Sequence, residues 1–145
     1  MKLKLIYPKW KKLKGQTTFN LPPHGPVVFA ATLPEDVDVS FTDENGEALD
    51  YDEACDLVAI SMMLSTQVKR GWAIADEYRR RGKKVLFGGI STMLHAEETM
   101  EHADTVFLGE SEGRMQEVID DFRRGALKRV YNYMTRQPAI EDVGP

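Results

Sequence analysis

The chain is poor in the residues that build disulfides and metal clusters. Its 145 residues contain a single cysteine, Cys55, and three histidines. One cysteine cannot form a disulfide within the chain, and it cannot supply the ligands of a cysteine-held zinc or iron–sulfur site alone. We therefore expect a reducing, cytoplasmic setting and no metal held by these residues.

A membrane-spanning segment and an excess of basic residues are also missing. No run approaches the roughly 18 consecutive apolar residues of a spanning helix, and the first apolar stretch is too short for a signal peptide. The net charge is −4, whereas a general nucleic-acid binder needs a basic face that releases counterions. We expect neither nucleic acid nor membrane as a partner. A chain of this length forms one domain and can bury roughly 70% of its unfolded surface.

Short apolar runs alternate with helical patterns along the chain. The runs at 57–60 and 85–87 lack polar alternation, which is typical of strands buried on both faces. The helix between them is expected to start at an N-cap, Ser65 or Thr66, and to end before Gly82 as a C′ glycine. The expected strands are 3–7, 37–42, 57–60, 85–87 and 104–108, with 130–131 as a candidate short extra strand. The expected helices are 24–33, about 66–82, 96–102 and 112–125, with one helical turn within 47–54.

This order predicts an α/β fold, a doubly wound five-stranded parallel sheet with helices on both faces. The simplest strand order is 2-1-3-4-5, as in Rossmann-like and flavodoxin-like domains. Ligands of such sheets bind beyond the carboxyl ends of the strands, where the winding reverses. The lysine-bearing loop 9–20 follows the first strand there. We expect it to be solvated, with folding over a ligand as the alternative.

Small and polar residues gather where the predicted strands end. A glycine pair at such an edge lets a flat ligand pack against bare backbone. The candidate ligand-binding residues are His24, Ser61, Met63, Ser65, Thr66, Gly88, Gly89, Ser91, Gly109 and Glu110. His24, at the start of the first helix, is a candidate axial ligand or polar contact.

Several common ligands of this fold are excluded by missing motifs. The segment after the first strand contains one glycine, Gly15, so G-x-G-x-x-G and the tight hydroxyl-rich FMN loop are absent there. G-x-x-x-x-G-K-[ST] does not occur in the chain. The first and third strands end in Tyr7-Pro8 and Ser61-Met62 rather than in the acidic residues of a phosphoacceptor domain.

The remaining pattern resembles cobalamin-binding domains. Ser61 and Met63 stand at the places of an S-x-L motif, with Met replacing Leu, and Gly88-Gly89 stand at the places of a G-G motif. The chain is most similar to the type of domain that precedes a radical-SAM catalytic domain. The ordered motifs are P-P-x-G at 22–25, A-D-E-Y-R-R-R-G at 75–82, V-x-x-G-G at 85–89, A-E-E-x-x-x-H-A-D at 96–104 and G-E-x-E at 109–112.

The resemblance implies a cofactor and a partner domain. In that family the hydroxyl and the glycines line a slot for the nucleotide tail of cobalamin. Residues 1–135 would form the cobalamin-binding domain, and 136–145 would begin a linker to a C-terminal radical-SAM domain. That domain, in a radical-SAM methyltransferase or oxidoreductase, would hold S-adenosylmethionine and a [4Fe-4S] cluster through C-x-x-x-C-x-x-C. This chain lacks the motif and is not expected to catalyse that reaction alone.

Two departures from the family pattern keep other functions open. The D-x-H-x-x-G motif that supplies a cobalt-ligating histidine is absent after the first strand, and Ile90-Ser91 stand where a histidine often follows G-G. The alternative is a degenerate domain that binds no cobalamin and docks on its catalytic neighbour. A stand-alone hydrolase or transferase is the weakest interpretation, because no nucleophile–base pair is evident at the strand ends.

Overall fold

In the part of the chain that the structure describes, the sheet has six parallel strands in the order β2-β1-β3-β4-β5-β6. This computed structural model describes residues 1–11 and 23–136. The strands are β1 (Lys2–Tyr7), β2 (Asp38–Asp43), β3 (Leu57–Ser61), β4 (Lys84–Gly88), β5 (Thr105–Leu108) and β6 (Val130–Asn132). The predicted parallel α/β architecture and the 2-1-3-4-5 order are confirmed. The strand count of five is wrong, because β6 extends the sheet beside β5.

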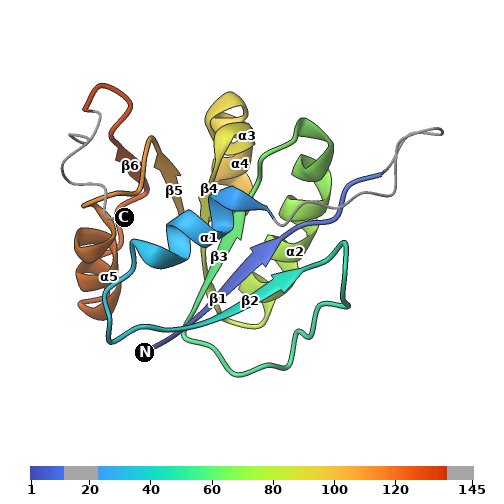
Figure 1. The fold of residues 1–145 in the computed structure, drawn as a ribbon, viewed down its shortest axis with the longest axis horizontal. Coiled ribbons are helices and arrows are strands. Elements are labelled where there is room, and N and C mark those ends of the chain that lie inside the picture. Colours follow the sequence, from blue (N-terminus) through green and yellow to red (C-terminus); the bar gives the residue numbers. More distant parts are fainter. Residues whose placement is uncertain (12–22, 137–145) are drawn as a thin grey trace.

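Helices cover both faces of the sheet. The helices are α1 (His24–Ala31), a 3-10 turn η1 (Ser65–Gln67), α2 (Val68–Arg80), α3 (Ile90–Leu94), α4 (Ala96–His102) and α5 (Met115–Arg123). Side chains of α2, α3 and α4 pack with Val58, Ile60 and Phe87 in one core cluster. Side chains of α1 and α5 pack with Leu5 and Leu86 in the other. Figure 1 shows α1 crossing one face of the sheet while α2 lies behind the strands.

Two local expectations are wrong. Residues 47–54 contain no helical turn: the segment runs past α2, where Tyr51 packs on Tyr78 and the Tyr78 hydroxyl donates to Asp50 O. Ser65 and Thr66 do not cap α2. Both are exposed in η1, and α2 begins only at Val68.

Glycines mark the turns between elements. Gly82 follows α2 with φ +77°, so the predicted C′ glycine is confirmed. The short helix α3 was not predicted. It begins directly after Gly89, whose φ of +92° turns the chain out of β4 within one residue.

Within residues 1–11 and 23–136, no helix has the length and hydrophobicity needed to cross a bilayer. Most of loop 9–20 and nearly all of the predicted linker 136–145 lie outside these ranges.

Candidate functional site

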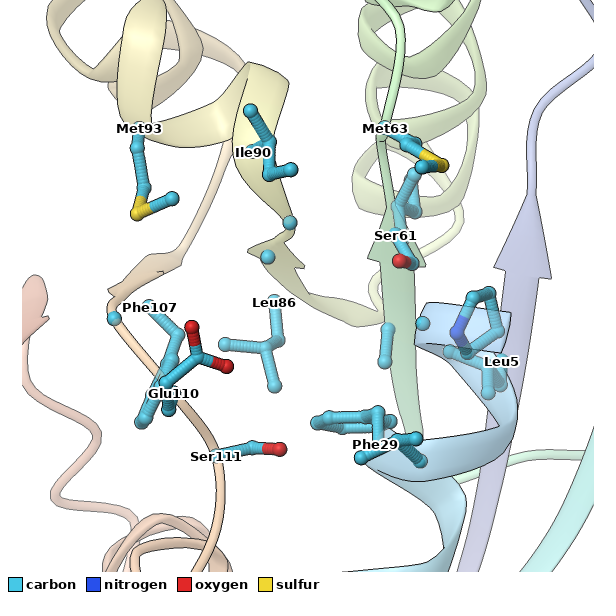
Figure 2. A pocket seen from close by; sticks show the side chains of 18 of the residues that line it. Leu5, Phe29, Ser61, Met63, Leu86, Ile90, Met93, Phe107, Glu110 and Ser111 are labelled. Atoms are coloured by element: carbon cyan, nitrogen blue, oxygen red, sulfur yellow. The ribbon is translucent and has the colours of Figure 1, made fainter. Parts of the chain in front are cut away.

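A pocket of about 460 Å³ lies at the carboxyl edge of the sheet, on the face that carries α1 and α5. Its floor is formed by Leu5, Ala59, Leu86 and Phe107 from the four central strands β1, β3, β4 and β5. The first three are register partners across β1, β3 and β4, so the backbone pairing itself places them in one row. Figure 2 shows Phe107 and Leu86 across the middle of the view and Leu5 at the right, with Phe29 of α1 below them.

The first turns of α1 form one wall of the pocket. The helix begins after Pro23, which has extended backbone angles, and it contributes His24, Gly25, Val28 and Phe29 to the lining. The segment is apolar and carries no acidic residue in its first turn. A flat apolar group between the sheet and α1 would therefore contact hydrocarbon on both sides.

Gly88 and Gly89 form the rim above β4, and they have different physical roles. Gly89 has φ +92°, and a Cβ placed on it would lie 2.5 Å from Met62 O. Glycine is thus required there by the backbone. A Cβ on Gly88 would meet no atom within 4 Å. Since Gly88 lines the pocket, its missing side chain leaves space that a ligand can occupy.

Ser61 ends β3 and Met63 lies in the loop that follows, which a buried glutamine, Gln67, holds in place. Gln67 Oε1 accepts hydrogen bonds from the backbone N–H groups of Met63 and Leu64, each at 2.9 Å. Gln67 Nε2 donates to Pro8 O at 2.6 Å and so ties this loop to the end of β1. Sequence reasoning missed Gln67, because an amide following Ser65-Thr66 reads as an ordinary helix-surface residue.

Tyr7, the last residue of β1, lies against the loop that follows β3. Its hydroxyl contacts Met63 Sδ at 3.9 Å, and its ring lies edge-on to Trp10. Burial raises the pKa of Tyr7, so the phenol is protonated at neutral pH.

The polar side chains of the pocket are hydroxyls, carboxylates and one imidazole. They belong to His24, Ser61, Glu110, Ser111 and Glu112, and among the residues that the structure describes no Lys or Arg lines the pocket. Figure 2 shows Ser61 and Ser111 on opposite sides of the pocket, with Glu110 beside Ser111. Within the described residues, no group of three or more His, Cys, Asp or Glu side chains is arranged to hold a metal ion.

The candidate residues chosen from the sequence divide into two groups. The pocket is lined by His24, Ser61, Met63, Gly88, Gly89, Gly109 and Glu110. Ser65 and Thr66 are exposed in η1, and Ser91 is buried in α3, so these three do not line it. Ligand binding by any of the ten stays a prediction.

The candidate residues chosen from the sequence omitted the four floor residues, and they also omitted Phe29, Ser111 and Glu112. The alternation of side chains along the buried strands would have identified the floor, because Leu5, Ala59, Leu86 and Phe107 all point to the α1 side.

The fold and the pocket together define a doubly wound α/β domain with a pocket at the carboxyl edge of its sheet. Comparison with known proteins finds two bacteriochlorophyllide d methyltransferases of Chlorobaculum tepidum. The C-8(2)-methyltransferase is 31% identical over 106 residues, which is 72% of this chain and 23% of the relative. The C-12(1)-methyltransferase is 32% identical over 115 residues, which is 77% of this chain and 25% of the relative.

The chain thus spans about a quarter of the length of these relatives. No protein-family model matches the chain. No solved structure matches it either.

Proposed function

We propose that this chain is the cobalamin-binding accessory domain of a larger radical-SAM methyltransferase, and that the pocket receives the nucleotide tail of the cofactor. The carrying observation is the open space over Gly88 at the carboxyl edge, bounded by an apolar floor and by α1. The similarity to two methyltransferases supports the reaction class, and the much greater length of both supports a separate catalytic domain.

The residues present fit the tail of the cofactor better than the whole of it. Small-molecule pockets commonly measure ~300–1,000 Å³ and are mostly apolar with a few polar groups. This pocket, at about 460 Å³, is of a size for one flat heterocyclic base, whereas complete cobalamin is far larger. The corrin macrocycle would accordingly lie outside the pocket, beyond the strand ends.

The residues of this chain would bind and orient rather than react. Bound cobalamin carries a methyl group between a donor and an acceptor. Ser61 would hydrogen-bond the inserted base, Gly88 would let it approach the backbone, and Leu86 with Phe107 would exclude water below it. We assign no residue of this chain to cobalt. S-adenosylmethionine and a [4Fe-4S] cluster would be held by the catalytic domain.

The test is a titration of the purified chain with hydroxocobalamin, followed by the visible spectrum and by retention on desalting. Gly88→Leu should abolish binding, because its side chain enters the pocket. Ala73→Leu adds the same side chain at an exposed position of α2 and should bind like wild type. Circular dichroism would verify that both variants are folded. Absence of binding by the folded wild-type chain would refute the proposal.

A second candidate function is a docking module that binds no cofactor. Its specific support is a set of exposed apolar side chains at or near the carboxyl edge, here called the apolar rim: Met63, Ile90, Leu94 and Met134, each at least half exposed. Apolar groups gathered in this way are typical of interaction surfaces. In the parent enzyme, Ser61→Trp would block the pocket. Full activity in that variant would favour docking, whereas loss of activity together with loss of cobalamin would favour cofactor binding.

A further inference from the structure

We propose that β2, the outer strand of the sheet, binds an extended basic segment of a separate protein, which adds to the sheet as a further strand. The inference does not depend on the proposed function, because no residue of β2 belongs to the described lining of the pocket.

The first observation is that one side of β2 is open. β2 pairs with β1 and ends the strand order, so among the described residues no strand covers its other side (Figure 1). The N–H groups of Asp38 and Glu44 donate to carbonyls at either end of β1, at 2.9 and 3.1 Å. Since backbone groups alternate in direction along a strand, the N–H and C=O groups of Val39 and Phe41 point away from β1. No described residue forms a hydrogen bond with these outward groups.

The second observation is that β2 lacks the usual protection of an edge strand. Natural edges are commonly blocked by lysine, proline or a bulge. β2 has the sequence D-V-S-F-T-D, and its register with β1 is unbroken from Asp38 to Asp43. Phe41 is 40% exposed and can pack against a side chain of an added strand. In strand addition, main-chain hydrogen bonds of this kind supply the affinity.

The third observation is the charge around this edge. Residues 35–56, which contain β2 and the segment after it, include ten acidic residues and no Lys, Arg or His. Glu35, Asp38 and Glu47 are exposed, and the ion pairs that this segment makes with described residues use other carboxylates. Opposite charges on neighbouring strands stabilise their pairing, so the complementary partner is a strand that carries Lys or Arg.

The same charge disfavours a second copy of this chain. Antiparallel pairing about a twofold axis would bring the Asp38 end of β2 beside the Asp43 end of the other copy, so carboxylates would meet at both ends. The apolar rim, which is the candidate surface for a catalytic neighbour, lies on the loop after β3, on α3 and beyond β6. β6 is the opposite edge of the described sheet. We therefore assign the β2 edge to a separate protein.

The experiment titrates three dye-labelled synthetic peptides with the purified chain and measures dissociation constants by fluorescence anisotropy. The first alternates lysine with valine, the second alternates glutamate with valine, and the third is the lysine–valine peptide with every backbone nitrogen methylated. The first should bind about tenfold or more tightly than either of the others, because it alone combines positive charge with backbone donors. Equal binding of the methylated peptide would overturn the proposal, since charge alone would then explain the affinity.

Two pairs of variants test the two sides of the contact. Phe41→Pro removes an outward N–H but no hydrogen bond to β1, and it should weaken binding about tenfold. Phe41→Val loses the same ring and keeps the N–H, so its affinity should stay within about threefold of wild type. Asp38→Lys should weaken binding about threefold or more, whereas Glu98→Lys, the same charge change on the exposed face of α4, should weaken it less. Equal losses within either pair would overturn the proposal.

Sedimentation of the chain without peptide tests the second copy as an alternative occupant. A monomer is expected. A dimer that Phe41→Pro dissociates would assign the edge to a second copy and overturn the proposal. Circular dichroism would verify that each variant is folded. If Phe41→Pro does not fold, the comparison of the methylated and unmethylated peptides on wild type still decides the matter.

Discussion

The glycine pair at the end of β4 allows one prediction to be developed from geometry alone. We expect Gly89→Ala to destabilise the domain strongly and Gly88→Ala to leave its stability nearly unchanged. The two substitutions add the same methyl group at adjacent positions. They differ in backbone conformation and in what the new Cβ would meet.

At Gly89 two costs add. A non-glycine residue held at φ +92° costs ~1–3 kcal/mol. The new Cβ would also lie 2.5 Å from Met62 O, closer than real contacts allow. Met62 O accepts the N–H of Ser91 at 3.0 Å, so moving it disturbs the start of α3. Overpacking of this kind typically costs ~1–3 kcal/mol, so the total is roughly 2–6 kcal/mol.

At Gly88 neither cost arises. Its φ lies outside the left-handed region, and no atom stands within 4 Å of the added Cβ. The change should stay within ~0.5 kcal/mol, or become slightly stabilising through the lower entropy of the unfolded chain.

Thermal and urea unfolding monitored by circular dichroism would check the pair. At ~2–4 °C per kcal/mol for a domain of this size, Gly89→Ala should lower Tm by roughly 5–20 °C, and Gly88→Ala by less than about 2 °C. Equal shifts for the two variants would refute the assignment of different roles to the two glycines.

Three further predictions concern other parts of the molecule. Gln67→Ala removes three hydrogen bonds and should lower the free energy of unfolding, measured in urea, by ~2–4 kcal/mol. The control Gln116→Ala, on the exposed face of α5, should lower it by under ~0.5 kcal/mol. Similar losses of stability in the two variants would contradict the role given to Gln67. A hydrogen bond from Lys4 lowers the pKa of Glu53 below its usual 4.5. The resulting stabilisation of the folded state is therefore present above pH 4.5 and is lost as the pH falls through the lowered pKa of Glu53. The midpoint of urea unfolding should accordingly fall less at acid pH in Glu53→Gln than in wild type. The same pH dependence of the midpoint in both proteins would argue against the pairing. If the apolar rim docks on the rest of the parent protein, Leu94→Glu should weaken that association while leaving Tm unchanged. Co-purification of the two separated parts would measure the association, with Ala73→Glu as the control.

The central strands were predictable because local composition and tertiary position agree. Leu57–Ile60 and Val85–Phe87 are apolar without alternation, and both are buried strands with neighbours on either side. The short sixth strand was harder. β6 has three residues, and its pairing with β5 depends on partners more than 20 residues earlier in the chain.

The candidate site was predictable only in part. Gly88, Gly89 and Ser61 were found because strand ends in a parallel sheet lie on one edge. Ser65 and Thr66 were chosen for the same reason, but the 3-10 turn carries them away from the pocket into solvent. Ser91 was chosen as a strand-end hydroxyl, yet α3 buries it.

The sequence by itself determined the order of the first five strands and of the helices α1, α2, α4 and α5, the glycine at the end of α2 and the edge at which a ligand would bind. These features depend on local periodicity and on backbone conformations that few residues adopt. The tertiary structure alone decided that Leu5, Ala59, Leu86 and Phe107 form one floor, that Gln67 joins two loops and that Glu112 borders the pocket. These groups are distant in the chain. Only the register of the sheet and the packing of α1 and α5 bring them together, and no local pattern records that register.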